Sequence, residues 1–248
     1  MDTKNSQSDF VFIIPTLTNV EGLEHVLALL KRFYPGHPFI VIDNKLKNVG
    51  FAKACNDGAK KAKGSFSPNY LVFLNDDVDF SSDWVNECLG TMKKHGWIAT
   101  SPILMSSKKS IENVVYVVLP YGKVKLITDP HNSEKIDGIS ATALVFETKS
   151  FFKLGGFDER FFAYLEDVDL FLRAKKQGLR FGVTKSAFVY HEGQKTSSKF
   201  KAKKAWLDFK NWILVIGKNW SREELKKYWW SIFVERLRNL AGVIKALF

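Results

Sequence analysis

The feature that most constrains the fold is a series of short apolar segments that alternate with stretches of helical periodicity. The first three apolar segments are residues 10–14, 39–42 and 70–74. Continuous apolar runs of this length, bounded by polar or turn residues, are typical of strands buried on both faces. We therefore predict an α/β fold with a Rossmann-like, mostly parallel central sheet flanked by helices.

Polar residues follow each of these three predicted strands. Thr16, Asp43 and Asp77 stand at or just beyond the strand ends. Ligands of open α/β sheets bind beyond the carboxyl ends of the strands. We therefore expect these three residues at one ligand-binding edge.

The middle of the chain continues the same alternation. We expect a helix from residue 84, a strand at 97–100, a looser substrate-facing flap at 106–137, a strand at 139–146 and a helix at 166–177. Gly155 and Gly156 indicate a tight turn, and Gly178 closes the last helix. These elements would complete one catalytic domain.

The cluster Asp76-Asp77-Val78-Asp79 comes directly after the third predicted strand. Carboxylates are hard oxygen ligands that suit Mn²⁺ or Mg²⁺. A divalent ion held by Asp77 and Asp79 would stabilise a departing nucleotide diphosphate. The alternative is an ordinary loop of capping and turn aspartates, and the position at a strand end favours the metal site.

A second acidic cluster, Glu166, Asp167 and Asp169, opens the predicted helix at 166–177. A helix N-terminus favours ionised carboxylates, and such a carboxylate can act as general base toward a hydroxyl. The alternative is ordinary helix-end charge, with Arg173 pairing to Asp169 one turn later. We assign the latter pair a mainly structural role.

Several ordered motifs together make the chain resemble family 2 glycosyltransferases, especially the rhamnosyltransferase-like branch. The resemblance covers roughly residues 10–195 and implies the GT-A fold. Its motifs are Asp43-Asn44, Asn48-Val-Gly-Phe-Ala-Lys-Ala-Cys-Asn56, Leu74-Asn-Asp-Asp-Val78, Gly156-Phe-Asp-Glu and Glu166-Asp-Val-Asp-Leu170. A match of this many motifs in order is far more specific than any one of them.

The resemblance also implies roles for single residues. Asp167 matches the catalytic base of the family, with Glu166 beside it sharing or supporting that role. Asp77 matches the metal ligand, Asp79 its helper, and His191 a histidine that completes the metal shell in some relatives, although a lone histidine is more often structural. The expected donor-binding residues are Pro15, Thr16, Asp43, Asn48, Lys53, Asn75 and Asp76.

The chain departs from the family pattern in the loop after Asp43-Asn44. Relatives have a longer segment with Ser and Thr, whereas here residues 45–47 lead almost at once into Asn48. The nucleotide base of the sugar donor would then be recognised through fewer contacts. Lys45, Lys47 and Lys53 could meet donor phosphates instead, although exposed loop lysines are the commoner outcome.

The last fifty residues differ in composition from the rest. Residues 199–248 hold 12 Lys and Arg against 4 Asp and Glu, and five of the seven Trp. We divide the chain into a catalytic domain at 1–198 and a helical segment at 199–248. Two apolar stripes mark its helices, one with Trp206, Phe209, Ile213, Ile216 and Trp220, the other with Leu225, Trp229, Ile232, Phe233, Leu237 and Leu240.

These stripes have two compatible interpretations. We favour packing of both stripes on the catalytic domain. The alternative is that an outer face of these helices contacts an anionic membrane surface. A nucleic-acid-binding module is a further option for a basic, aromatic segment. We expect no nucleic acid as a partner, because the carboxylates at the predicted binding edge would repel phosphates.

Composition limits the location of the protein. No apolar run reaches the roughly 20 residues that a membrane-spanning helix needs, and residues 10–14 are too few for a signal peptide. Cys55 and Cys88 lack the spacing of a zinc site, and we expect both to be reduced and buried. We expect a cytoplasmic protein, peripheral on the membrane if the last segment binds lipid.

The function that these observations favour is an inverting, metal-dependent hexosyl transfer from a UDP, dTDP or GDP sugar to a glycan or lipid-linked saccharide. A retaining GT-A enzyme and a nucleotidyltransferase are the alternatives among enzymes. A non-catalytic protein that binds nucleotide or glycan is the third. The conjunction of Asp77, Asp167 and His191 argues against the last of these.

Overall fold

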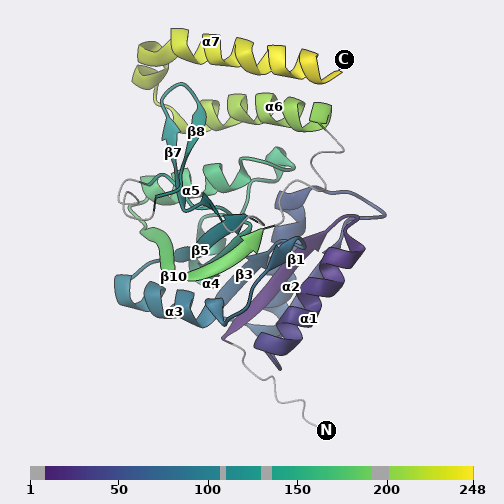
Figure 1. The fold of residues 1–248 in the computed structure, drawn as a ribbon. Helices are drawn as coiled ribbons and strands as arrows, with labels where there is room; N and C mark the ends of the chain where they lie inside the picture. Colours follow the sequence, from purple (N-terminus) through teal and green to yellow (C-terminus); the bar gives the residue numbers. More distant parts are fainter. Residues whose placement is uncertain (1–8, 107–109, 130–135, 192–200, 248) are drawn as a thin grey trace.

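A mixed sheet forms the centre of the computed structural model, which describes residues 9–106, 110–129, 136–191 and 201–247 (Figure 1). Its strand order is β2-β1-β3-β9-β5-β10-β4, and β6 pairs with β5. The strands are β1 (Phe10–Thr16), β2 (Phe39–Asp43), β3 (Tyr70–Leu74), β4 (Val78–Asp79), β5 (Ala99–Ser106), β6 (Ile111–Asn113), β9 (Ala143–Glu147) and β10 (Phe181–His191).

Five of these described strands share one direction. β1 is parallel to β2 and β3, and β5 is parallel to β10. β9 lies between the two groups and is antiparallel to both β3 and β5, while β4 and β6 are antiparallel to their partners. The predicted mostly parallel α/β sheet is confirmed, with β9 as its central reversed strand.

Helices cover both faces of the sheet. They are α1 (Val20–Phe33), α2 (Phe51–Phe66), α3 (Trp84–His95), α4 (Thr148–Lys153) and α5 (Glu166–Lys176), with a short 3-10 helix η2 (Glu159–Phe161). Alternate residues of β3 enter opposite cores: Leu71 and Phe73 pack on the side of α2 and α5, and Val72 and Leu74 on the side of α1 and α3. This alternation is why the strand consists of apolar residues throughout.

The expected flap at 106–137 contains, in its described part, strand β6 of the central sheet and a hairpin of β7 (Val115–Leu119) and β8 (Lys123–Ile127). The tip of the hairpin is bound to the C-terminal helices. The carbonyl of Pro120 accepts a hydrogen bond of 2.8 Å from the Trp220 indole, and that of Gly122 accepts one from Arg236. The hairpin is therefore a buttress between the sheet domain and the C-terminal helices.

The C-terminal helices are α6 (Lys201–Asn219) and α7 (Arg222–Leu247), and α6 lies between α7 and the rest of the molecule (Figure 1). Trp212, Val215 and Ile216 of α6 join Tyr116 and Val168 in a third apolar core. The predicted boundary at 198/199 lies outside the described residues. None of the described helices is long and apolar enough to cross a bilayer.

The expectation that both apolar stripes pack on the domain is wrong in part. In the first stripe, Ile216 of α6 and Trp220 just after it pack inward, but Trp206 and Ile213 are half exposed. The buried face of α6 is centred instead on Leu207, Trp212, Val215 and a polar residue, Asn211. In α7, Leu225 and Ile232 pack inward, whereas Trp229, Phe233, Leu237 and Leu240 are exposed because no further layer covers this helix.

Candidate functional site

The carboxyl ends of β1, β2 and β3 meet at one edge of the sheet. Thr16 pairs with Asp43 in the β1–β2 register. The Thr16 hydroxyl donates a hydrogen bond of 2.6 Å to Asp76, whose carbonyl also accepts one of 2.8 Å from the Asn19 side chain. Burial raises the pKa of Asp76, and its hydrogen bonds oppose that shift. Pro15, Thr16, Asp43 and Asp76 thus lie at one edge of the sheet, and their contact with a donor stays a prediction.

Asp77 faces His191 across the β4–β10 pair. The antiparallel register sets Val78 opposite His191, so the residue before Val78 comes beside the imidazole. The Asp77 Oδ1 and His191 Nε2 atoms are 3.3 Å apart, and both side chains are less than one-fifth exposed. Burial lowers the pKa of His191, but the nearby carboxylates outweigh it and raise the pKa to about 9.

Glu112, which sequence reasoning did not select, completes this arrangement. Its Oε2 lies 3.1 Å from His191 Nδ1, on the opposite side of the ring from Asp77. A carboxylate on one ring nitrogen fixes the orientation of a histidine whose other nitrogen is used for binding. Glu112 belongs to β6, and no motif marks it, so only the fold could identify it.

Asp79 is not part of this pair. Its side chain is about half exposed and lies 3.3 Å from His25 Nε2 of α1. Asp77 and Asp79 flank Val78, yet Asp77 turns toward β10 and Asp79 toward α1. The structure therefore brings two of the three predicted metal ligands together.

The pair of Asp77 and His191 suits a divalent cation. Asp77 Oδ1 is buried, makes no hydrogen bond in the described part of the chain, and lies 3.3 Å from its ion-pair partner, the His191 imidazole. Within the described ranges, no three His, Cys, Asp or Glu side chains are arranged to hold a metal by themselves. Magnesium sites commonly use one or two protein groups together with substrate phosphates and water. Asp77 and His191 would be those groups here.

Glu166 and Asp167 open α5, with Glu166 buried and Asp167 partly exposed. Asp167 accepts hydrogen bonds from the backbone N–H groups of Val168 (2.8 Å) and Ala141 (3.4 Å). Burial raises the pKa of both carboxyls, and the charge of Asp167 raises that of Glu166 further. Raised pKa values of this kind suit carboxyl groups that exchange protons near neutral pH.

The two acidic clusters meet at a short segment before β9. Ala141 N donates to Asp167, and the next carbonyl, that of Thr142, accepts a hydrogen bond of 2.9 Å from Asn75 N. Asn75 precedes Asp76 and Asp77. Asp167 and the Asp77 cluster therefore flank the same segment, although they are far apart in sequence. Sequence reasoning did not select this segment.

Asp169 and Arg173 have the structural role predicted for them. Arg173 Nε donates to Asp169 over 2.8 Å, and its other nitrogens bind the carbonyls of Leu154 and Gly156. Asp169 is fully buried and also lies 2.7 Å from Lys218 Nζ of α6. The network binds α5 to the Gly155-Gly156 turn and to the C-terminal helices.

The loop that leads into Glu166 has an unusual backbone. Phe162, Tyr164 and Leu165 all have positive φ angles of 62–69°, which non-glycine residues rarely adopt. The buried Asn211 side chain of α6 supports this loop: its Nδ2 lies 3.0, 2.8 and 2.7 Å from the carbonyl oxygens of Phe161, Ala163 and Tyr164. Helix α6 thus holds the segment that presents Asp167.

The segment around Asn56 packs against the same region. Asn56 is buried in α2, donates to the carbonyl of Phe157 over 2.8 Å and accepts from its N–H over 3.0 Å. Gly50 has φ +86°, and a Cβ there would stand 2.4 Å from the Phe162 carbonyl. The motif at 48–56 therefore shapes the loop before Glu166.

Two predicted donor residues lie away from the β1 edge contacts. Lys53 forms ion pairs with Asp57 (3.0 Å) and Glu159 (3.8 Å). Asn48 caps its own turn by accepting from Gly50 N over 3.0 Å. Contact of either residue with a donor stays a prediction.

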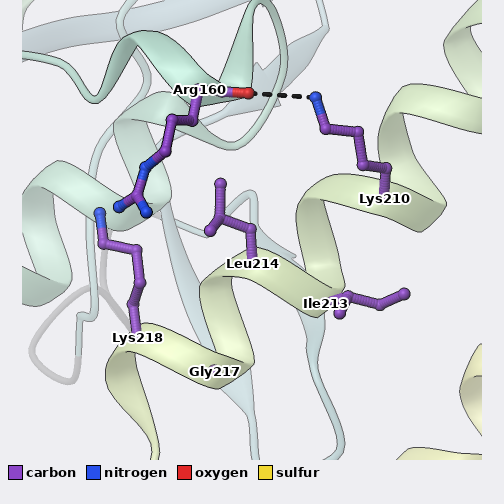
Figure 2. A pocket seen from close by; sticks show the side chains of 6 residues that line it. All are labelled: Arg160, Lys210, Ile213, Leu214, Gly217 and Lys218. Atoms are coloured by element: carbon purple, nitrogen blue, oxygen red, sulfur yellow. Dashed lines mark hydrogen bonds between the residues drawn. The ribbon is translucent and has the colours of Figure 1, made fainter.

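A shallow depression of about 690 Å³ lies along α6 (Figure 2). It is lined by Arg160, Lys210, Ile213, Leu214, Gly217 and Lys218. Its cations are already engaged: Arg160 and Lys218 pair with Asp158 at 2.6 and 2.5 Å, and Lys210 donates to the Arg160 carbonyl. We assign this depression to the joint between α6 and η2.

The family comparison matches part of the chain. Residues 22–117 fit the model described as glycosyl transferase family 2, and this stretch includes Asp43, Asp77 and Glu112. The low-salt glycan biosynthesis hexosyltransferase Agl10 of Haloferax volcanii is 19% identical over 236 residues, covering 83% of this chain and 76% of that protein. Over residues 22–117 the chain is therefore similar to this family.

Solved structures share the fold. The crystal structure of GalNAc-T7 with UDP, GalNAc and Mn²⁺ has a TM-score of 0.62 and 17% identity, covering 94% of this chain and 45% of that one. TarS of S. aureus has a TM-score of 0.55 and 15% identity, covering 96% and 43%. This chain spans less than half the length of either protein. The likeness shows the GT-A fold.

Proposed function

We propose that this chain is an inverting glycosyltransferase, which moves a hexose from a nucleotide-diphosphate sugar to a hydroxyl of a glycan or lipid-linked saccharide. The observation that carries the proposal is the convergence of two acidic clusters on residues 141–142. One cluster contains the buried Asp77 carboxylate, which is paired with His191, and the other contains Asp167. Two residues that could hold a metal ion lie on one side of this segment, and a carboxylate that could act as a general base lies on the other. This arrangement fits sugar transfer.

The donor would lie along the edge formed by β1, β2 and β3. Thr16, Asp43 and Asp76 present hydroxyl and carboxylate groups there, which suit the base and ribose of a nucleotide. The diphosphate would extend toward Asp77 and His191. When bound there, a Mn²⁺ or Mg²⁺ ion neutralises the charge that develops on the departing diphosphate. GalNAc-T7 was crystallised with UDP and Mn²⁺, which supports this assignment by fold alone.

Asp167 would act on the acceptor. The acceptor oxygen attacks the anomeric carbon while its proton passes to an Asp167 oxygen, and the bond from that carbon to the diphosphate breaks. A single displacement of this kind inverts the anomeric configuration. Two backbone N–H groups fix the Asp167 carboxylate before the acceptor arrives. Glu166 is more deeply buried and would support the pocket behind it.

The donor nucleotide and the acceptor are inferred from the sequence motifs, from the relative and from the composition of the C-terminal segment. UDP, dTDP and GDP are all open as donor nucleotides, and the rhamnosyltransferase-like branch stays a prediction from motifs. Agl10 is named for glycan biosynthesis, which favours a saccharide acceptor. A lipid-linked acceptor at the cytoplasmic membrane face would agree with a basic, Trp-rich C-terminal segment.

A turnover assay tests the proposal. The full chain is incubated with UDP, dTDP and GDP sugars, Mn²⁺ and a lipid-linked saccharide extract, and nucleoside diphosphate release is measured. We expect acceptor-dependent release that falls by a factor of roughly 10² or more in Asp167→Asn. Asp9→Asn, at the opposite end of β1, serves as the matched control. Equal release by Asp167→Asn would overturn the assignment of the base.

A further inference from the structure

Helix α7 carries an uncovered apolar stripe. It consists of Trp229 (62% exposed), Trp230 (59%), Phe233 (48%), Leu237 (50%), Leu240 (37%), Ile244 (53%) and Leu247 (65%). Large apolar side chains gathered in this number on one exposed surface mark an interaction site. We call this set the α7 stripe.

The stripe is one face of the helix. Phe233, Leu237, Leu240, Ile244 and Leu247 follow each other at spacings of three and four residues, as side chains on one helical face do. The opposite side of α7 rests on α6 and buries Glu235 and Val243. Thus α7 is anchored by one side and presents the stripe from the other, so exposing the stripe requires no rearrangement.

Beyond the first turn of α7, which holds the exposed Glu223 and Glu224, the exposed charges of the helix are basic. Lys226, Lys227, Arg238 and Lys245 are exposed on α7. After its first turn, the only acidic residue of α7 is Glu235, which is 6% exposed and paired with Lys123 and Arg238. An apolar stripe with a basic border matches the acyl chains and anionic headgroups of a bilayer surface.

We propose that the α7 stripe docks the protein on an anionic phospholipid membrane, with α7 lying in the plane of the interface. The tryptophans would sit at headgroup level, where amphipathic rings are favoured, and the lysines would meet lipid phosphates. No described helix can span the bilayer, which agrees with a helix that lies on it. The proposal goes beyond the proposed catalytic function and does not depend on it.

A second copy of the chain fits the stripe less well. Pairing two α7 stripes would bring two sets of border lysines together, with no exposed acidic side chain of the helix beyond its first turn to meet them. Like charges at such a contact disfavour association. α7 is also the outermost layer of the molecule, so a flat surface can approach it without meeting the sheet domain (Figure 1).

Vesicle flotation with the full chain tests the proposal. The probes are vesicles of phosphatidylcholine alone and of phosphatidylcholine with phosphatidylglycerol. We expect binding to the anionic vesicles, a loss of roughly ten-fold or more in W229S/W230S/F233S, and weakening by salt. The matched control is V20S/L126S, which removes two exposed apolar side chains elsewhere.

Two further measurements keep the outcome clear. Circular dichroism establishes that the variants fold, and quenching of tryptophan fluorescence by brominated lipid, reduced in W229S/W230S, would support insertion of these side chains. Anionic-vesicle binding by the triple variant equal to that of the unaltered chain would overturn the proposal. The proposal would also be overturned if the unaltered chain bound no vesicles but formed dimers that the triple variant did not form. The stripe would then be a self-association surface.

Discussion

His191 Nε2 lies 3.3 Å from Asp77 Oδ1, while its other ring nitrogen lies 3.1 Å from Glu112 Oε2. The imidazole is thus held between the carboxylate of Glu112 in β6 and that of Asp77 in the turn before β4. If Asp77 and His191 bind the cation that accompanies the donor, Glu112 is the residue that fixes the ring for that contact.

We therefore predict that Glu112→Gln weakens Mn²⁺-dependent nucleotide binding by about 10- to 100-fold, the usual effect of removing such a supporting carboxylate. His191→Ala should weaken it at least as much. Calorimetric titration measures both, with Glu87→Gln on the exposed side of α3 as the control. Unchanged binding in Glu112→Gln would show that the ring needs no such support.

The raised pKa of Asp167 leads to a prediction about the pH dependence of turnover. A general base must be ionised, and burial raises the pKa of Asp167 above its ordinary value of about 3.9. Activity should therefore fall as the pH drops through this raised pKa, at a higher pH than for a free aspartate. The rate with saturating donor, measured across the acid range, checks this. An acid limb at the ordinary pKa would contradict the environment assigned to Asp167.

Because Asn211 of α6 supports the loop before Glu166, we expect turnover to depend on this side chain. Asn211→Ala would remove the side-chain donor from three carbonyls of the loop at 161–164, of which only that of Phe161 keeps a further hydrogen bond within the described residues, from Ala163 N, and would release the left-handed backbone before Glu166. We expect a loss of about 1–3 kcal/mol in the free energy of unfolding. Turnover should fall more than nucleotide binding does. The exposed Asn86 gives the matched control, and an equal loss of binding and turnover would indicate general destabilisation.

The sequence predicted the frame of the fold better than its details. The strands at 10–14, 39–42 and 70–74 were correct, because short apolar runs have few other structures open to them. The Asp77–His191 contact was predicted only through the family resemblance, since it depends on the register of the two-residue strand β4. Glu112 carries no local signal at all.

The C-terminal helices show why periodicity alone misplaced a face. Counting apolar residues put Trp206 and Ile213 inside, but the polar Asn211 occupies the centre of the buried face of α6 because the left-handed loop needs its amide. For α7, periodicity could not distinguish Ile232, which packs on α6, from Phe233, which is exposed.

Asp158 predicts an acid-sensitive joint between η2 and α6. Hydrogen bonds from Arg160, and then Lys218, hold the pKa of Asp158 well below its usual range. A depressed pKa stabilises the fold above the ordinary value of about 3.9 and loses that contribution as the pH falls toward the depressed pKa. Asp158→Asn should cost about 1 kcal/mol at neutral pH, a figure reduced because Arg160 is largely exposed.

Urea unfolding as a function of pH measures this effect. The difference in stability between the unaltered chain and Asp158→Asn should shrink as the pH falls below about 4. A difference that stays constant down to strong acid would show that Asp158 does not stabilise the fold through its charge.

The most direct test of the central claim is calorimetric titration of the full chain with UDP, dTDP and GDP, with and without Mn²⁺, beside Asp77→Ala. We predict that at least one nucleotide diphosphate binds only with the metal, and that this binding disappears in Asp77→Ala while the variant remains folded. Binding that is independent of both the metal and Asp77, or no binding of any nucleotide, would contradict the claim that the edge beside His191 is a nucleotide-sugar site.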